Sequence, residues 1–298
     1  MVEILTTQNL RKSYKKLDAL KGLSINVKQG QIYGLLGPNG SGKTTTLGIL
    51  LGVIKQDSGT YSWFGKGEID ENRSNIGSLL ETPNFYPYLN AVDNLKIVST
   101  IKSLDNTKLR IEKVLRRVDL WKRKDAAFKT YSLGMKQRLA IASAILADPD
   151  ILVLDEPTNG LDPQGIAEIR SLILDIAEDG KTIIIASHIL DEIEKMCTHV
   201  AILKNGELIR EATLEEIMTQ DKLLCIGADS NDELKLALET IPQMKFVRDI
   251  SPNILIGVEE NISNAMVNKM LAEKGVYLNT IMPYKKNLES TFLEIVNK

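Results

Sequence analysis

The sequence predicts an α/β fold with a central parallel sheet, an antiparallel β patch, a helical subdomain and a small α+β domain at the C-terminal end. Residues 1–30 alternate like β-strands, which indicates the antiparallel patch. Residues 31–80 read as a strand, a helix and a further strand that ends at Glu81, and residues 131–190 alternate helix and strand, the pattern of a parallel sheet. Known motifs stop near residue 221, so we expect one domain at 1–220 and a second at 221–298.

The first domain supplies a strand, a loop and a helix in that order. QIYGLL at 31–36 is a short apolar run that predicts a buried strand. After a glycine-rich loop, helical periodicity continues until Asp57-Ser58-Gly59 stops it. The apolar residues at helical spacing are Leu47, Leu50, Leu51 and Ile54.

Three further features are predicted in this domain. Residues 86–130 read as helical, and we place a helical subdomain at about 86–148. AILKNGELIR at 201–210 predicts a hairpin around Asn205-Gly206. Thr213 and Glu216 then form a capping box for a short helix.

The second domain reads as a β-α-β-β-α-β module of ferredoxin-like type. We see no ligand chemistry in its sequence. A packing or dimer-supporting role and a regulatory ligand site both stay open. Its predicted segments are the strand KLLCIGA, the helix NDELKLALETI, the strands KFVRDI and ILIGVE, the helix NISNAMVNKMLAEKG, the strand VYLNTIMPY and a short final helix TFLEIV.

The glycine-rich loop has the spacing G-x-x-x-x-G-K-T and lies between a strand and a helix. Such a loop turns its N–H groups inward and places phosphates at a helix N-terminus. We expect Lys43 to reach the β- and γ-phosphates of a nucleotide and the Thr44 hydroxyl to ligate Mg²⁺. A glycine-rich turn without a ligand is the alternative, and the context argues against it. The predicted nucleotide-binding residues are Gly37, Pro38, Asn39, Gly40, Ser41, Gly42, Lys43, Thr44 and Thr45.

An acidic pair ends the later apolar run ILVLDEP at 151–157. Carboxylates at the end of a buried strand are costly without a partner, and a metal is a natural partner for the first. We expect Asp155 to hold Mg²⁺ and Glu156, on the opposite side of the strand, to polarise an attacking water. A solvated strand end is the alternative for such a pair alone.

Between these motifs, YSLGMKQR at 131–138 places Ser132 as the N-cap of a helix. Alone, an ordinary capped helix is the favoured interpretation. In this position, however, the Ser-x-Gly turn resembles the signature of the ATP-binding subunits of ABC transporters. The resemblance covers about residues 3–218 and implies that Ser132 and Gly134 contact the ATP held by a second subunit, either an identical copy or a paralogue.

The resemblance implies ATP and Mg²⁺ as cofactors and three further site residues. Tyr14 matches the aromatic residue that stacks on adenine. Asp162, in Gly160-Leu161-Asp162, matches the loop that communicates across the dimer. His188 matches the histidine that contacts the γ-phosphate, whereas His199 has no matching role.

Two positions depart from the common family pattern. The usual Leu-Ser-Gly-Gly-Gln signature is Tyr-Ser-Leu-Gly-Met here, but Ser132 and Gly134 are kept. Where the family usually has Gln, this chain has Glu81, which we expect to ligate Mg²⁺ and to act in catalysis. Glu81, followed by TPNFYPYLNAVDNL, resembles the ATPases of bacterial bacitracin and lantibiotic exporters. This implies export of a drug, peptide antibiotic or lipid-like molecule.

Composition sets the expected compartment and partners. The net charge of −2 gives no indication of a nucleic-acid partner. Cys197 and Cys225 lie in apolar settings and lack metal-binding spacing. We interpret them as buried or free thiols in a reducing cytosol. No signal peptide is apparent, and no apolar run approaches the ~20 residues needed to cross a bilayer. We therefore expect a peripheral protein on the cytoplasmic face of a bacterial membrane, with a separate transmembrane permease.

Several alternatives stay open at this point. An importer ATPase is a close rival, and an ABC ATPase without a transport role or a P-loop kinase is less favoured. The aromatic segment after Glu81 has two interpretations, a groove for a short permease helix or core packing. Its residues are Tyr86, Tyr88 and Leu89.

Overall fold

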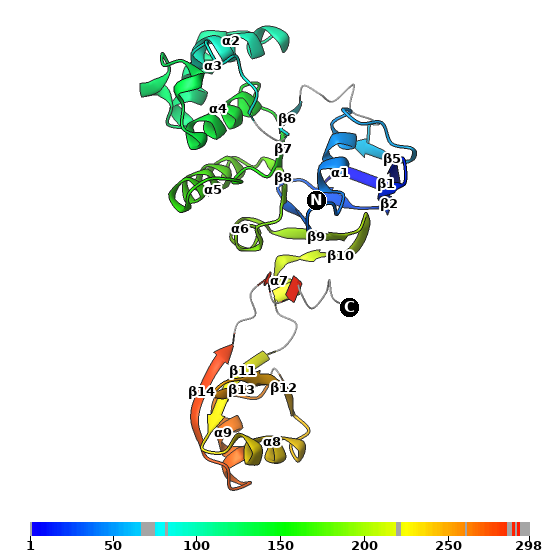
Figure 1. Cartoon of the computed structure of the whole chain (residues 1–298), viewed down its shortest axis with the longest axis vertical. Coiled ribbons are helices and arrows are strands. Elements are labelled where there is room, and N and C mark those ends of the chain that lie inside the picture. The colour runs from blue at the N-terminus through cyan, green and yellow to red at the C-terminus, as the bar shows by residue number, and fades with distance from the viewer. Residues whose placement is uncertain are drawn as a thin grey trace. The chain divides into compact units, whose positions relative to one another are not determined.

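The computed structural model describes residues 2–66, 75–80, 83–218, 222–259, 261–284, 288–289 and 291–292. The chain divides into two units, Met1–Leu214 and Glu215–Lys298. Figure 1 labels most of their helices and strands. No helix in the described part of the chain is both long and apolar enough to span a membrane.

An antiparallel sheet forms the N-terminal part of the first unit. Its order is β2-β1-β3, and β5 also pairs with β1. The last residue of β1, Tyr14, is opposite Leu17 at the end of the β1–β2 ladder. This register fixes the position of the predicted adenine-stacking residue. The bounds are β1 Glu3–Tyr14, β2 Leu17–Leu23, β3 Asn26–Lys28 and β5 Ser58–Trp63.

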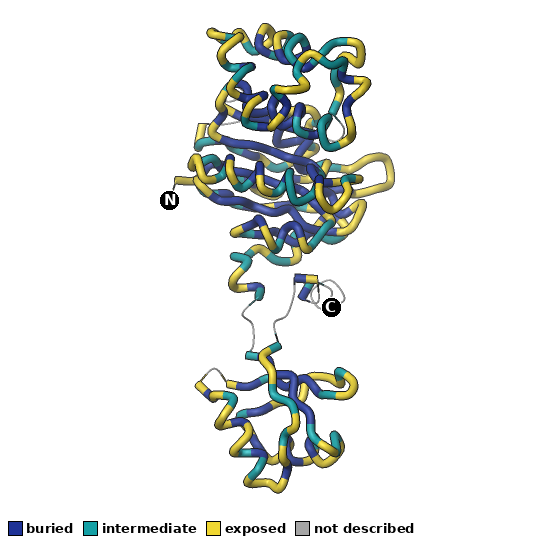
Figure 2. Tube along the Cα trace, turned by 90° about the vertical axis from the view of Figure 1, so that its left-hand side faces the viewer, coloured by how far each residue is buried: buried dark blue, intermediate teal, exposed yellow. Residues whose placement is uncertain are grey.

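The central sheet has the order β10-β9-β4-β8-β7-β6, in which every pair is parallel except β9–β10. Every residue of β4, β7 and β8 is buried, as expected for parallel strands covered on both faces. Figure 2 shows these strands in the dark blue of buried residues. The bounds are β4 Ile32–Leu36, β6 Ile76–Leu79, β7 Ile151–Asp155, β8 Thr182–Ser187, β9 His199–Lys204 and β10 Glu207–Thr213.

The helices of the first unit largely follow the predicted periodicity. In Figure 1, α2, α3 and α4 gather beside the β6 end of the sheet as the helical subdomain. Asn90 caps α2 by accepting a hydrogen bond from the Asp93 N–H at 2.8 Å. The bounds are α1 Lys43–Leu50, α2 Ala91–Ile101, α3 Thr107–Arg117, α4 Leu133–Ile145, α5 Pro163–Glu178 and α6 Leu190–Met196, with 3₁₀ turns at Trp121–Arg123 and Phe128–Thr130.

The helix after the glycine-rich loop is shorter than predicted. It ends at Leu50, and Gly52 follows with a φ of 69°. A glycine in the left-handed conformation ends a helix by offering its N–H to an earlier carbonyl. Ser58 then begins β5 rather than ending the helix. Ile54 nevertheless packs against the core, which explains its place in the apolar pattern.

The predicted hairpin is confirmed. Strands β9 and β10 pair across Asn205-Gly206, whose φ angles are 52° and 81°. Helix α7, Leu214–Met218, follows Thr213 directly.

The second unit has the predicted β-α-β-β-α-β order. Its sheet order is β12-β13-β11-β14 with every pair antiparallel, the arrangement of a ferredoxin-like module. Its core brings residues from α8 and α9 against β11 and β13. The predicted helix TFLEIV lies outside the described residues except for Thr291 and Phe292. The bounds are β11 Lys222–Ala228, α8 Asn231–Glu239, β12 Met244–Ile250, β13 Asn253–Val258, α9 Asn264–Ala272 and β14 Leu278–Tyr284.

Candidate functional site

The glycine-rich loop connects β4 to α1 in a conformation that requires glycine. Gly42 has a φ of 105°, and a Cβ atom there would lie 2.6 Å from the Ala19 carbonyl oxygen. The loop therefore lies directly against β2. Gly42 is also the N-cap of α1 and has no side chain to cap it. The first N–H groups of α1 are thus available for an anion.

Lys43 extends back across its own loop. Its Nζ atom donates a hydrogen bond to the Gly37 carbonyl at 2.8 Å and to the Pro38 carbonyl at 3.4 Å. The side chain is only 6% exposed and lies 3.9 Å from Oε1 of Glu156. Burial lowers the pKa of Lys43, while Glu156 and Asp155 act in the opposite direction. A desolvated ammonium group at this place interacts strongly with a phosphate.

The acidic pair lies at the carboxyl end of β7. Asp155 is the last residue of the strand and is buried. Glu156 has a φ of 48°, which is unusual for a residue with a side chain, and its N–H donates to the Ala186 carbonyl of β8 at 2.9 Å. This turn ends the strand and separates the environments of the two carboxylates.

His188 directly follows β8, the strand next to β7. Its Nδ1 atom lies 2.8 Å from Oε2 of Glu156, with the two side chains 40% and 20% exposed. The carboxyl ends of two neighbouring parallel strands thus bring a histidine and a carboxylate together. This pair can orient a water and accept its proton.

A cleft of about 450 Å³ joins these groups. Tyr14, from the antiparallel sheet, lines the same cleft as Lys43, Thr44, Glu156 and His188. Asn39, Gly40, Gly42 and Thr45 line it as well. Gly37 and Pro38 instead contact Lys43 through their carbonyl groups, and Ser41 is buried. A phosphate-binding loop facing a carboxylate–histidine pair is suited to phosphoryl transfer to water.

Comparisons with known proteins agree with this geometry. The family model for ABC transporters matches residues 20–159. The bacitracin transport ATP-binding protein BcrA of Enterococcus faecalis is 35% identical, over 99% of this chain and 97% of that protein. The lantibiotic transport ATP-binding protein SrtF of Streptococcus pyogenes is 40% identical, over 70% of this chain and 90% of that protein.

The chain belongs to the ATP-binding subunits of ABC transporters. It is an ATPase that powers transport through a separate permease. A solved structure of the ATP-binding cassette MJ0796, a dimer in a post-hydrolysis state with ADP and phosphate, is also similar. It has a TM-score of 0.63 and 29% identity, over 71% of this chain and 99% of that one.

In this ABC ATPase subunit, the signature serine caps α4. Ser132 Oγ accepts a hydrogen bond from the Met135 N–H at 3.3 Å. Asp162 caps α5 in the same way, because its Oδ1 accepts from the Gly165 N–H at 2.8 Å. Neither residue lines the cleft, and neither does Gly134.

The two loops that carry these caps are neighbours. A Cβ atom at Gly160 would lie 3.3 Å from Leu133, and one at Gly134 would lie 3.9 Å from Leu161. Leu133 is 45% exposed at this place. The tertiary structure therefore brings the loops of the predicted signature and dimer residues together, and these residues lie outside the lining of the cleft of the same chain.

The residues predicted to hold Mg²⁺ fit that ion by their chemistry. Thr44 lines the cleft, and Asp155 is 2% exposed at the end of β7. These are hard oxygen ligands of the kind that Mg²⁺ prefers. Within the described part of the chain, no cluster of three or more His, Cys, Asp or Glu side chains forms a protein-only metal cage. Mg²⁺ is usually coordinated by one or two carboxylates together with nucleotide phosphates, and these residues match that type of coordination. Glu81 lies outside the described residues.

Three residues of the cleft were not predicted from the sequence. Leu17 and Ala19 belong to β2 and reach the cleft because the loop packs against that strand. Asn159 lies three residues after Glu156, in the turn before Gly160. Asn159 lies between the acidic pair and the Gly160-Leu161-Asp162 loop, and this position was the one sequence feature that could have indicated its role. The two histidines separate as expected, since His199 contacts Gln31 at 2.9 Å and does not line the cleft.

Proposed function

We propose that this ABC ATPase subunit powers export of a drug, peptide antibiotic or lipid-like molecule through separate transmembrane subunits. The observation that carries the proposal is the full-length similarity to a bacitracin transport ATP-binding protein, which covers 99% of this chain. The lantibiotic relative supports the same class of cargo. In this arrangement the protein is peripheral and lies on the cytoplasmic face of the membrane.

Two copies, or one copy and a paralogue, sandwich two ATP molecules in this mechanism. The loop from Gly37 to Thr45 binds the ATP of its own chain, and Tyr14 stacks on the adenine. Ser132 and Gly134 serve the ATP of the other chain, and Asp162 contacts the partner. The absence of these three residues from the lining of the cleft supports this division.

Hydrolysis follows from the groups at the sheet edge. Thr44, Asp155 and Glu81 would hold Mg²⁺, which would neutralise charge on the phosphates. Glu156 accepts the proton of the attacking water, and His188 holds Glu156 and the γ-phosphate in place. Closure of the two copies excludes water and aligns these groups, so catalysis is positioning plus electrostatics.

A groove of about 360 Å³ beside the helical subdomain is the proposed contact with the permease. Tyr86 and Ile101 line it, together with residues on both sides of the Glu81 position, Leu80 and Pro83. Tyr86 and Tyr88 are 50% and 69% exposed, which disfavours the core-packing alternative for these two side chains. Leu89 is half-buried. An exposed aromatic pair beside a groove lined by both apolar and polar side chains is suited to a short amphipathic helix.

Native purification from membranes tests the proposal. The tagged chain, carrying Glu156→Gln to trap the ATP-bound state, is isolated from detergent-solubilised membranes, and co-purifying proteins are identified. We expect an integral membrane permease whose reconstituted complex moves peptide antibiotics or amphiphilic drugs outward in an ATP-dependent way. Recovery of a solute-binding protein with inward transport contradicts export, and recovery of ribosomes or DNA contradicts transport.

A pair of aromatic variants tests the groove separately. Tyr86→Ala with Tyr88→Ala is expected to reduce permease recovery while ATP binding is unchanged. Tyr277→Ala is the matched control, since Tyr277 is 75% exposed in the second unit. Equal permease recovery from both variants would remove the groove from the proposal.

A further inference from the structure

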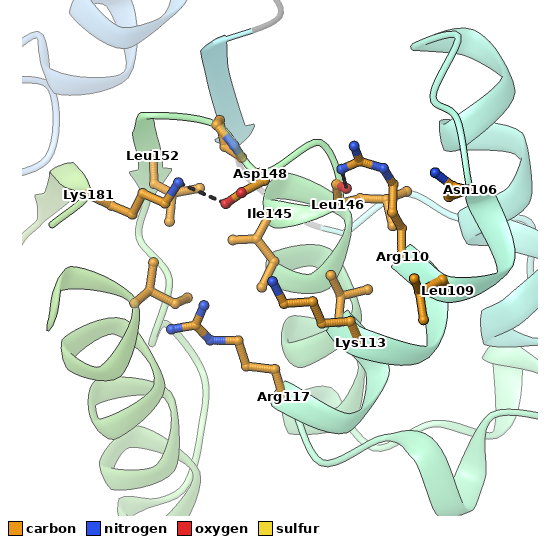
Figure 3. Close-up of a pocket in the computed structure, with 13 residues that line it drawn as sticks. Asn106, Leu109, Arg110, Lys113, Arg117, Ile145, Leu146, Asp148, Leu152 and Lys181 are labelled. Carbon is orange, nitrogen blue, oxygen red and sulfur yellow. Dashed lines mark hydrogen bonds and ion pairs between the residues drawn. The ribbon is translucent and has the colours of Figure 1, made fainter. Parts of the chain in front are cut away.

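A second cavity, of about 310 Å³, lies between the helical subdomain and the sheet. Figure 3 shows it between α3, the C-terminal end of α4 and the segments around Asp148 and Lys181. None of its lining residues lines the ATP cleft. Its volume is at the lower end of the range of small-molecule sites.

The cavity gathers positive charge in a chain whose net charge is −2. Arg110, Lys113 and Arg117 come from α3, and Lys181 directly precedes β8, whereas Asp148 is the only carboxylate among the described lining residues. Spacings of three and four residues put the three α3 cations on one face of that helix. Like charges at this spacing repel and cost a few tenths of a kcal/mol per pair, and neighbouring carboxylates or a bound anion offset this repulsion.

Two of the four cations are already paired. Arg117 donates to Asp175 at 2.9 Å and to Asp179 at 2.6 Å. Lys181 donates to Asp148 at 2.8 Å. The hydrogen bond from Lys181 lowers the pKa of Asp148, and the charges of Lys113 and Arg110 contribute in the same direction.

The other two cations have no such partner. Arg110 donates only to main-chain oxygens, to Asp105 at 3.0 Å and to Leu146 at 3.5 Å. Within the described ranges, no carboxylate lies at ion-pair distance from Arg110 or Lys113. In Figure 3 the Lys113 ammonium points into the space beside Ile145. A guanidinium and an ammonium with free N–H groups thus face one cavity.

Apart from Asn106, the rest of the cavity wall is apolar. Leu109 and Val114 of α3 line it, opposite side chains of α4, β7 and α5. Those opposite side chains are Ile145, Leu146, Leu152 and Ile176. A ligand that fits combines an anionic group with a small apolar body.

We propose that this cavity binds a phosphate group, free or as the monoester of a small apolar molecule, through Arg110 and Lys113. A phosphate offers at least three acceptor oxygens and close to two negative charges at neutral pH, which matches a guanidinium fork beside an ammonium. The body of an ester then lies against Ile145 and Leu152. The site is separate from ATP binding and does not depend on the proposed cargo.

Fluorine NMR with 4-fluorophenyl phosphate as the probe tests the site. Saturable line broadening is expected with the wild-type chain, with a Kd on the order of 1 mM for a ligand of this size. Lys43→Ala should retain saturable broadening, because that substitution removes a phosphate contact of the ATP cleft only, and the Arg110 and Lys113 variants are compared in this background. Lys113→Gln should raise the Kd by about tenfold, and the double variant Arg110→Gln with Lys113→Gln should abolish broadening.

Lys108→Gln is the matched control, because Lys108 is an exposed cation of the same helix that does not line the cavity. It should bind the probe as the wild type does, and thermal melting checks that every variant is folded. Inorganic phosphate as competitor separates the two sources. If inorganic phosphate displaces the probe at a concentration similar to that of the probe, the ligand of the site is free phosphate. If much more inorganic phosphate is needed, the ligand is a phosphate ester.

Three outcomes would overturn the proposal. The first is no saturable broadening with the wild type. The second is a loss of probe binding with Lys108→Gln as large as that with Lys113→Gln, which would indicate general attraction of the probe to a basic helix. The third is equally strong binding of uncharged 4-fluorobenzyl alcohol, which would indicate an apolar cavity without phosphate recognition.

Discussion

Nδ1 of His188 lies 2.8 Å from Oε2 of Glu156, and the same carboxylate lies 3.9 Å from Nζ of Lys43 through its other oxygen. One carboxylate thus connects the histidine after β8 with the lysine of the phosphate-binding loop. Both contacts exist because β4, β8 and β7 are parallel neighbours in that order, and the residues that follow their carboxyl ends meet at one edge of the sheet. The first two predictions follow from this connection.

Replacing Glu156 separates chemistry from binding. Glu156→Gln keeps the size of the side chain and an acceptor oxygen but removes the base. We expect ATP hydrolysis to fall by ~10²–10⁴ while ATP affinity is unchanged, so that an ATP-dependent dimer accumulates. Phosphate release and size-exclusion chromatography with ATP measure the two effects. A wild-type rate together with only monomer would refute both the base and the sandwich.

The two histidines provide a matched comparison. His188→Ala is expected to slow hydrolysis strongly, because Glu156 loses its partner at the water-facing side of the cleft. His199→Ala should leave the rate close to wild type, since His199 contacts Gln31 and Thr198 instead. Steady-state ATPase rates of both variants decide the assignment, and similar losses in both would indicate damage to the fold.

Ser132 has a structural and a proposed binding role that one substitution can separate. Ser132→Asp keeps an N-cap acceptor for the Met135 N–H, so α4 should stay stable. It places a carboxylate where the γ-phosphate of the partner is proposed to lie, and ATP-dependent dimerisation should be lost.

Ser263→Asp is the control for this change. Ser263 caps α9 with the same geometry, accepting from the Met266 N–H at 3.3 Å. We expect it to leave dimerisation intact. If Ser132→Asp dimerises with ATP as the control does, the signature helix does not face the nucleotide of a second copy.

We expect Lys43 to affect both the affinity for ATP and the uptake of protons on ATP binding. Lys43→Ala loses a charge-assisted phosphate contact, which weakens ATP binding by roughly 10- to 100-fold. Burial lowers the pKa of Lys43, whereas bound phosphate raises it. ATP binding should therefore take up protons, increasingly so as the pH rises above neutral.

Calorimetry in buffers of different ionisation enthalpy measures this uptake. At pH 9 the heat of ATP binding to the wild type should depend on the ionisation enthalpy of the buffer. For Lys43→Ala this dependence should be much smaller. A buffer-independent heat for both would mean that Lys43 stays fully protonated before ATP binds.

Glu81 can be tested although it lies outside the described residues. Glu81→Gln restores the residue usual in the family and keeps an acceptor oxygen, so appreciable hydrolysis should remain. Rates measured across a Mg²⁺ titration should show a higher Mg²⁺ requirement, because one carboxylate ligand is lost. Complete loss of activity would mean that the charge has a different role.

The sequence by itself determined the elements and much of the chemistry. The loop from Gly37 to Thr45, the strand ending at Asp155 and the cap at Ser132 are each encoded over a few adjacent residues. Strand and helix patterns were readable for the same reason, since they depend on short-range periodicity. The end of α1 was misjudged because Gly52 stops the helix while Ile54 still packs on the core.

Only the tertiary structure decided which of these residues meet. The strand order of the sheet brings His188 next to Glu156, and the packing of β2 places Ala19 against the loop. Ser132 lies outside the lining of the cleft. The cavity with Arg110, Lys113 and Lys181 also joins segments far apart in the chain. Such contacts depend on strand order and on long-range packing, which local sequence patterns do not encode.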